Sequence, residues 1–309
     1  MSLKDTQALF REGKIGKSEY IERMHRIHRF LFDYAEFIRD TDIAGIEIAD
    51  GRVVMTARSS GVRILCDRED QRNIPVEILN FGAYEPQDSA MMLRLAGPAV
   101  TIFDIGANIG WHTLAFARAC PGAAIHSFEP LPPTYRYLRE NVALNDAANV
   151  TTYNFGLSDR AGELVFYFDP AGTGSASSAN ITGSRAVREI RCPVETVDAF
   201  TSRTGLRPDF IKCDVEGAEW LVIQGATETI RRERPVLFAE MLRKWAATFG
   251  YHPNRIIEHL AGLGYGCFVT DGARLAAFGR MTDETPETNF FFLHGERHAA
   301  VIRELAGNR

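Results

Sequence analysis

The residues best suited to ligand chemistry form a glycine-containing turn, Asp104-Ile-Gly-Ala-Asn-Ile-Gly110, between a predicted strand and a predicted helix. Glycine lets the backbone turn sharply and approach a ligand, and Asn108 also tolerates a left-handed conformation. The backbone N–H groups that open the helix can hold a carboxylate. Glu129 ends the next predicted strand, where its carboxylate can accept both hydroxyls of a ribose. The pattern predicts a nucleoside-containing ligand at this edge of a sheet.

Two details of the turn indicate which ligand it is. The spacing is G-x-N-x-G rather than the G-x-G-x-x-G of dinucleotide-binding sequences. Asp104 ends its strand beside the turn, where a carboxylate suits a cationic group better than a pyrophosphate. S-adenosylmethionine carries an ammonium, a carboxylate, a ribose and a sulfonium, so we predict it as the cofactor. The alternative is a purely structural turn in which Asp104 caps the helix.

Carboxylates at two later strand ends are the candidate catalytic groups. Asp214 and Glu216 follow the predicted strand PDFIKCD, and Glu240 ends PVLFAE. Ligands bind at the carboxyl ends of strands in open α/β sheets, and a hydroxyl acceptor needs a general base or a metal. We predict catalytic roles for Asp214, Glu240 and His252, a loop histidine in FGYHPNR. Helix-end, strand-end and surface roles remain the alternatives, and a second hypothesis has Asp214, Glu216 and Glu240 binding Mg²⁺.

The elements that must position these residues follow from the hydrophobic pattern. From about residue 100, strand and helix patterns alternate, which predicts a mainly parallel sheet covered by helices on both faces. We expect an accessory region at 1–97, with a helix at 18–39 and short antiparallel strands at 45–66, and a cofactor domain at 98–309. The Gly/Ser-rich stretch 169–184 predicts a surface loop that can cover the acceptor.

Composition limits the class of protein. The 309 residues include 35 Lys and Arg against 40 Asp and Glu, a net charge of −5, with 45% hydrophobic residues. These values exclude a wholly disordered or fibrous chain and disfavour a general nucleic-acid binder. No apolar run approaches the roughly 18 residues of a membrane span, and no secretory signal is recognisable. The five cysteines lack C-x-x-C spacing. We therefore expect a cytoplasmic protein. The apolar stripe of the helix at 18–39 can pack on the main body or in a homo-oligomer.

Seven segments carry a family resemblance: FDIGANIGWHTLAFA, HSFEP, NVALNDAANV, GLSDRAGE, CPVETVDAF, DFIKCDVEGAEWLVIQGA and NFFFLH. In this order, over roughly residues 80 to 294, they resemble the FkbM family of S-adenosylmethionine-dependent methyltransferases. The resemblance implies a class I methyltransferase (Rossmann-like) fold, a seven-stranded sheet with helices on both faces and one antiparallel strand. It also implies O-methylation of a small-molecule or carbohydrate acceptor, such as a sugar, a glycolipid or a natural product.

The resemblance also implies roles for individual residues. Asp214 would lie near the amino group or the transferable methyl, and Glu85 would contact cofactor or acceptor. The remaining cofactor contacts would be Asp104, Gly106, Asn108 and Gly110 for the methionine part, Glu129 for the ribose, and Ser158 and Asp159 for the adenine. For Asp159, a simple turn role is equally compatible. N-methylation, and a non-catalytic cofactor-binding or interaction protein, remain the alternative functions.

Overall fold

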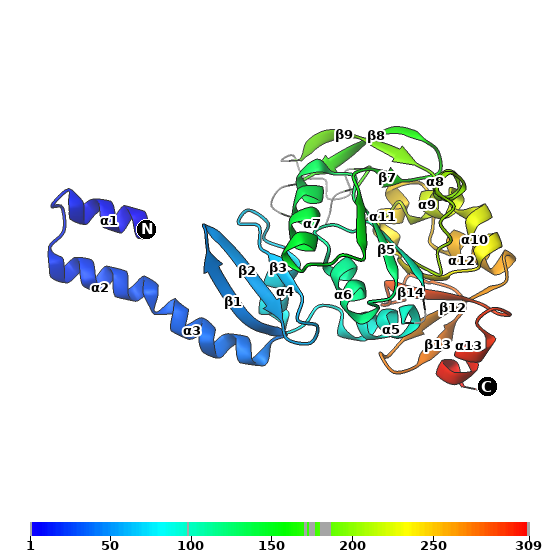
Figure 1. Ribbon diagram of the computed structural model, residues 1–309, viewed down its shortest axis with the longest axis horizontal. Coiled ribbons are helices and arrows are strands. Elements are labelled where there is room, and N and C mark those ends of the chain that lie inside the picture. Colours follow the sequence, from blue (N-terminus) through cyan, green and yellow to red (C-terminus); the bar gives the residue numbers. More distant parts are fainter. Residues whose placement is uncertain (1, 98, 170–171, 173–176, 180–186, 308–309) are drawn as a thin grey trace.

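A mostly parallel eight-stranded sheet forms the centre of the molecule (Figure 1). The computed structural model describes residues 2–97, 99–169, 172, 177–179 and 187–307. The strand order is β13-β12-β14-β11-β10-β4-β5-β6, and the five strands from β11 to β6 are parallel. The strands are β4 (Thr101–Ile105), β5 (Ala124–Phe128), β6 (Val150–Tyr153), β10 (Phe210–Cys213), β11 (Val236–Glu240), β12 (Tyr265–Thr270), β13 (Leu275–Phe278) and β14 (Asn289–His294).

The predicted α/β architecture is confirmed, but the number of strands in the sheet is not. The expected sheet has seven strands, and the structure adds β13 as an eighth at the edge. Strand β14 is antiparallel to β11 and to β12, and β13 pairs antiparallel with β12. The Asp271-Gly272 turn between β12 and β13 explains the extra strand, because Gly272 has a φ of +92° and closes a hairpin.

Helices cover both faces of the sheet, as the alternating pattern predicts. In β4, Ile102 packs with α5 (Pro86–Ala96), α6 (Trp111–Ala119) and α13 (Ala299–Ala306). The next residue, Phe103, packs on the opposite face, since successive side chains of a strand alternate. The helices on that face are α8 (Val197–Thr204), α9 (Glu219–Gln224), α10 (Thr227–Glu233), α11 (Arg243–Thr248) and α12 (Asn254–Gly262).

The topology creates a crevice between β4 and β10. From β4 the chain continues to β5 and β6 on one side, and it returns through β10 and β11 on the other. In open α/β sheets this reversal of strand order marks the point where ligands bind, at the carboxyl ends of the strands. The glycine turn after β4 and the carboxylates after β10 and β11 therefore meet at one edge.

The first third of the chain builds a separate layer. An antiparallel sheet of β1 (Ile43–Ala49), β2 (Arg52–Ala57) and β3 (Arg63–Leu65) confirms the short strands expected there. It packs with α4 (Ile74–Phe81) against residues at the start of α6. Helix α5, although N-terminal to residue 97, packs into the core of the main sheet. The division at 97 and 98 remains a prediction.

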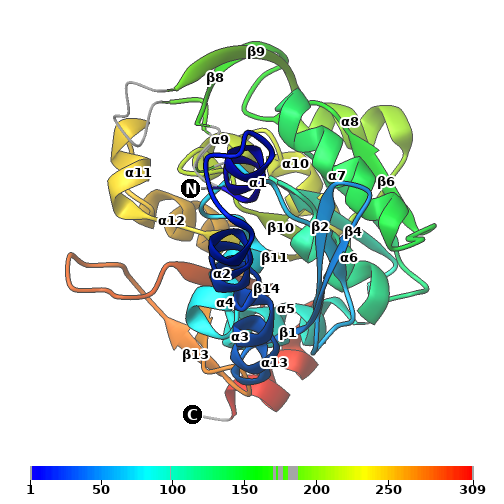
Figure 2. The same ribbon diagram turned by 90° about the vertical axis from the view of Figure 1, so that its left-hand side faces the viewer.

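The helix expected at 18–39 is two helices, α2 (Lys17–His28) and α3 (Phe30–Phe37), followed by a short 3₁₀ turn, η1 (Ile38–Asp40). With α1 (Leu3–Arg11) they extend away from the body, and Figure 2 views the molecule from the end that they form. None of the helices in the described residues is long and apolar enough to cross a membrane.

A third sheet and one long helix complete the fold. Helix α7 (Pro132–Leu144) connects β5 to β6. Strands β7 (Gly156–Leu157), β9 (Arg188–Glu195) and β8 (Gly162–Phe168) form a small sheet in that order. The Gly/Ser-rich stretch predicted as a loop joins β8 to β9, and most of it lies outside the described residues.

Candidate active site

The glycine turn after β4 lies directly against the backbone that follows β10. Gly106 has a φ of +77°, and a Cβ at this position would stand 1.8 Å from the carbonyl oxygen of Asp214. Asn108 adopts the predicted left-handed conformation, with a φ of +48°. The turn therefore requires glycine for two reasons: its conformation, and the close approach of a second strand end.

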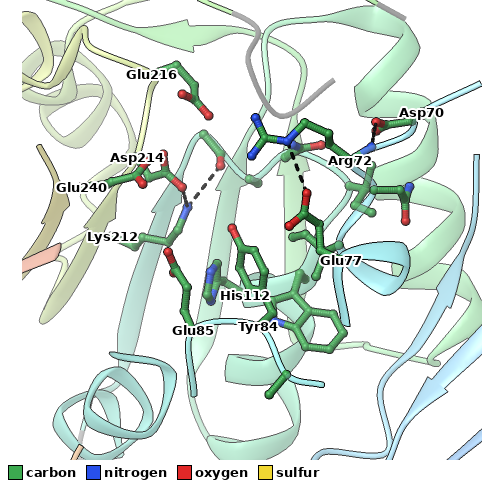
Figure 3. A pocket seen from close by; sticks show the side chains of 18 of the residues that line it. Asp70, Arg72, Glu77, Tyr84, Glu85, His112, Lys212, Asp214, Glu216 and Glu240 are labelled. Atoms are coloured by element: carbon green, nitrogen blue, oxygen red, sulfur yellow. Dashed lines mark hydrogen bonds and ion pairs between the residues drawn. The ribbon is translucent and has the colours of Figure 1, made fainter. Parts of the chain in front are cut away.

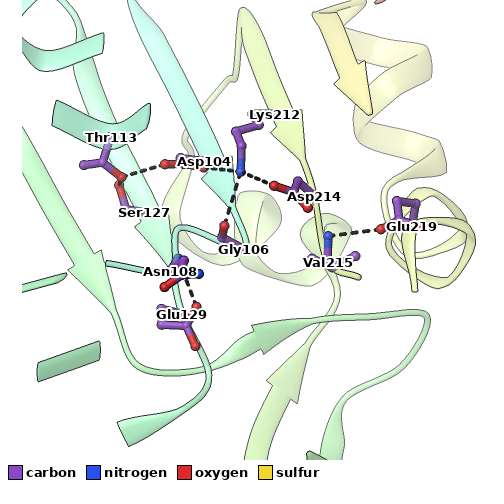
Figure 4. Close-up of polar contacts among 10 residues, drawn as sticks. All are labelled: Asp104, Gly106, Asn108, Thr113, Ser127, Glu129, Lys212, Asp214, Val215 and Glu219. Atoms are coloured by element: carbon purple, nitrogen blue, oxygen red, sulfur yellow. Dashed lines mark hydrogen bonds and ion pairs between the residues drawn. The ribbon is translucent and has the colours of Figure 1, made fainter. Parts of the chain in front are cut away.

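A buried lysine joins these two strand ends. Lys212, in β10, is 2% exposed, and its Nζ lies 3.3 Å from Asp104 and 3.2 Å from Asp214 (Figure 4). It also donates to the carbonyl of Gly106 at 3.2 Å. Burial alone would lower the pKa of Lys212, but the two carboxylates raise it above its ordinary value. Lys212 is thus a permanent positive charge beneath the turn.

Asp104 does not have the position expected of a direct cofactor contact. It is fully buried, and Thr113 donates to its second carboxylate oxygen at 2.6 Å. Lys212 lies 3.3 Å from its first oxygen, so both oxygens of Asp104 face groups of the protein itself. Gly110 likewise starts α6 with a φ of +95°, and a Cβ there would meet Leu138. Neither Asp104 nor Gly110 lines the cavity described below, and their cofactor contacts stay predictions.

A cavity of about 370 Å³ opens beside this network (Figure 3), within the usual size range of ligand pockets. Five of the predicted residues line it: Glu85, Gly106, Asn108, Asp214 and Glu240. Glu216 of the metal hypothesis lines it as well. The sequence reasoning missed most of the other lining residues, among them Arg72, Asn73, Trp111, Lys212 and Trp245.

Three carboxylates gather at one side of the cavity. Asp214, Glu216 and Glu240 each have an oxygen within 4.8 Å of the others. Burial and the neighbouring Asp214 raise the pKa of Glu216 and of Glu240 well above the ordinary value. Burial would also raise the pKa of Asp214, but Lys212 holds it below its usual range. One oxygen of Glu216, Oε2, is buried without a hydrogen-bond partner in the described structure.

The aromatic floor of the cavity comes from the front of the chain and from α6. In Figure 3, Tyr84 lies between the carboxylate cluster and a second group of charged residues, Asp70, Arg72 and Glu77. Burial and four nearby carboxylates raise the pKa of Tyr84. Its ring lies 6.4 Å from Trp111 and 6.1 Å from His112. Burial and Lys212 lower the pKa of His112 to about 4, so this imidazole is neutral at physiological pH.

Glu129 and its expected neighbours lie outside the described cavity lining. Glu129 is buried under the turn, where it accepts the N–H groups of Asn108 and Leu131. Burial raises its pKa to about 7. Ser158 is buried and donates to Asp159 at 3.2 Å. The ribose and adenine contacts of these residues stay predictions.

His252 is not brought to this site. It is exposed and lines a separate cavity with Arg255 and Arg280, where its Nδ1 accepts the N–H of Asn254 at 3.2 Å. This corrects the expectation that His252 shares a catalytic centre with Asp214 and Glu240. Its position before α12 agrees instead with the surface or capping role that was left open.

Comparison with known proteins gives the family of the chain. Residues 104–267 match the model described as "Methyltransferase FkbM domain". The methyltransferase sdnD of Sordaria araneosa is 33% identical over 156 residues, which cover 41% of this chain and 60% of that protein. The 2-O-methyltransferase NoeI of Sinorhizobium fredii is 31% identical over 155 residues, covering 45% and 63%.

A third relative is the hexuronic acid methyltransferase AglP of Haloferax volcanii, 29% identical over 143 residues that cover 46% of this chain and 56% of that protein. The chain thus spans less than two thirds of the length of each of these relatives. The family model, in contrast, covers just over half of the chain and begins at Asp104 of the glycine turn. The chain belongs to the FkbM family of methyltransferases.

Proposed function

We propose that this protein is an S-adenosylmethionine-dependent O-methyltransferase whose acceptor is a hydroxyl of a sugar, a glycolipid or another natural product. The observation that carries the proposal is the carboxylate cluster of Asp214, Glu216 and Glu240 beside the glycine turn. Family membership supports methyl transfer, and two relatives are named for sugar-type or O-directed methylation.

The residues of the cavity fit the proposed cofactor. S-adenosylmethionine supplies an electrophilic methyl on a sulfonium, together with a cationic ammonium group. The orphaned Oε2 of Glu216 and the raised pKa of this carboxyl mark a position that a positive ligand would stabilise. Gly106 and Asn108 would hold the methionine part from below, and Lys212 would fix the two strand ends that carry these groups.

Within this arrangement Glu240 is the candidate general base. A hydroxyl is a weak nucleophile, and its proton must leave as the oxygen attacks the methyl carbon. Glu240 lies at the end of β11 in the same cavity as Asp214, and its raised pKa brings it closer to the basicity needed at neutral pH. The proton would pass to a carboxylate oxygen of Glu240, and Asp214 would stay ionised beside Lys212.

Calorimetric titration of the full chain with S-adenosylmethionine and with NAD tests the cofactor. Transfer of a labelled methyl group to a panel of sugars, glycolipids and amines then separates O-methylation from N-methylation and from cofactor binding without catalysis. Glu240→Gln should abolish most transfer, whereas Glu258→Gln, an exposed glutamate of the separate cavity, is the matched control. Binding of NAD alone would overturn the proposal.

The second candidate for the carboxylate cluster is a Mg²⁺ site formed by Asp214, Glu216 and Glu240. Carboxylate oxygens from adjacent strand ends suit this hard cation. Lys212 already neutralises one oxygen of Asp214 at 3.2 Å, which weakens the site for a divalent ion. Methyl transfer that persists unchanged after metal stripping with EDTA would eliminate this candidate.

We also propose that the N-terminal helices pair with a second copy of the chain. Helix α3 has no buried residue, although its sequence FLFDYAEF is apolar on nearly all sides. Large exposed apolar side chains gather on α1 to α3: Leu3, Phe10, Ile21, Phe30, Leu31, Phe32, Tyr34 and Phe37. At roughly 200 Å² per aromatic side chain, the five aromatic residues alone expose about 500 Å², more than half of the ~800 Å² per partner of a stable interface.

Sedimentation of the full chain tests this pairing. Phe32→Glu places a charge on a 71% exposed side chain of α3 and should convert a dimer to a monomer. Val100→Glu, at a 67% exposed position outside the helices, should leave the dimer intact. A monomeric wild-type chain would refute the pairing. The five free cysteines, four of them buried, agree with a reducing compartment, and we propose a cytoplasmic location.

A further inference from the structure

The side chain of Asn73 is buried in the cavity wall and has no hydrogen-bond partner in the described structure. Asn73 is 2% exposed and precedes α4 at the N-cap position, where Asn usually accepts a backbone N–H through its side chain. Here that hydrogen bond is absent, and both the amide oxygen and the amide nitrogen lack a partner in the described structure. The backbone carbonyl of Asn73 instead accepts from Val76 and Glu77.

A buried amide without partners destabilises the folded protein, since it gives up its hydrogen bonds to water and gains none. Such groups in native proteins call for an explanation, and an unseen ligand is one of them. Asn73 lines the same cavity as Asp214 and Gly106. An amide offers two donors and one acceptor oxygen, which match a ligand that both donates and accepts.

The neighbours of Asn73 extend this polar surface. Arg72 contacts Glu77 at 3.3 Å, and both line the cavity. Asp70, which is buried, accepts the backbone N–H of Arg72 at 2.9 Å and so fixes the start of the segment. Figure 3 shows Asp70, Arg72 and Glu77 on one side of the view and Asp214, Glu216 and Glu240 on the other, with Tyr84 between them.

The segment 70–77 lies outside the part of the chain that matches the family model. Within it Arg72 pairs with Glu77, whereas the opposite side carries the carboxylate cluster that suits a cation. Tyr84 and Trp111 add aromatic surface between the two sides. A ring with several hydroxyl groups can hydrogen-bond both the amide and the ion pair and pack against the aromatic side chains.

We propose that Asn73, with the Arg72–Glu77 pair, forms the acceptor subsite and binds adjacent hydroxyl groups of a polyhydroxylated ring. This inference rests on the proposed function and names the acceptor class. Asn73 is a specificity-determining residue in it: its amide hydrogen-bonds the hydroxyls that flank the one to be methylated. The ring would then present the remaining hydroxyl toward Glu240.

Ligand-observed saturation-transfer NMR on the full chain with S-adenosylhomocysteine tests the subsite without chemistry. The probes are the methyl glycosides of glucose, mannose, rhamnose and glucuronic acid at millimolar concentration, with cyclohexanol as the single-hydroxyl control. At least one glycoside should bind the wild type more tightly than cyclohexanol. Asn73→Leu and Arg72→Gln should each weaken that binding about ten-fold or more, as loss of a hydrogen bond predicts.

Arg68→Gln is the matched control, because Arg68 is highly exposed and lines a different cavity. Asn73→Leu should melt at or above the wild-type temperature and leave the affinity for S-adenosylhomocysteine unchanged. Two binding results would overturn the subsite: no glycoside binds the wild type, or cyclohexanol binds it equally well. Two results for Asn73→Leu would do the same: a melting temperature several degrees lower, or weaker binding of S-adenosylhomocysteine alone. Glycoside binding that needs Asn73 but gives no methyl transfer would instead refute the proposed function.

Discussion

Replacing Lys212 by Met tests whether the buried ion pairs hold the two strand ends together. Methionine keeps most of the length and the apolar stem of lysine, so the change chiefly removes the charge. In the variant, Asp104 would be fully buried without a counter-charge, and Asp214 would lose the lysine at 3.2 Å. Breaking a buried pair by removing one partner costs about 3–5 kcal/mol.

For a chain of this size, that loss lowers the melting temperature by about 2 °C per kcal/mol, or roughly 6–10 °C. The deficit should shrink as the pH falls, because the pKa of Asp214 is no longer held low by Lys212 in the variant and this carboxyl then takes up a proton more readily. Thermal melting and urea unfolding at several pH values measure both effects. Lys14→Met is the control, since it breaks only the exposed pair with Glu12, worth about 0–1 kcal/mol. A loss below about 1 kcal/mol at neutral pH for Lys212→Met would refute the reasoning.

Three further predictions concern single residues. Gly106→Ala should abolish cofactor binding by calorimetry and lower the melting temperature, because its Cβ would meet the backbone of Asp214 at 1.8 Å; wild-type affinity would contradict this. Glu240→Gln should reduce kcat about 10²- to 10⁴-fold with unchanged cofactor affinity. His252→Gln should leave kcat near the wild-type value. If methyl-transfer assays showed the larger loss for His252→Gln, the general base would be His252 and not Glu240. Burial raises the pKa of Glu219 to about 7 from an ordinary 4.5, so the folded state binds the extra proton in this window and stability should fall as pH rises through it. Urea titrations of Glu219→Gln should show a flatter pH dependence, and an unchanged slope would count against the shift.

The fold could be predicted from the sequence wherever a strand is an uninterrupted apolar run. The run that became β4 and the closing NFFFLH of β14 are of this kind, and both strands are buried on two faces. Strand β13 escaped prediction because LAAF is short and half exposed, and its place in the sheet depends on its pairing with β12. The division of the N-terminal helix near Arg29 had no breaker residue to announce it.

Within the site, the glycine turn and the strand-end carboxylates could be predicted because their positions follow from the chain order of the sheet. Lys212 left a sequence signal that went unused: a lysine inside the apolar strand FIKC must be buried with a counter-charge. Asn73 gave no such signal in the sequence, because its burial depends on the packing of α4 against the cavity. His252 was misplaced for a related reason, since a loop histidine has no fixed direction until the loop is packed.

The residues that could be predicted and those that could not come from two different parts of the chain. The side that would hold the methyl donor is built from β4, β10 and β11, inside the segment that the family model covers. The opposite side comes from residues 70–85, before that segment begins. A shared donor side with a separately built acceptor side allows the family to keep one reaction while the acceptor changes. If Asn73 binds the acceptor as we propose, the choice of acceptor depends on a segment that similarity over residues 104–267 does not reach.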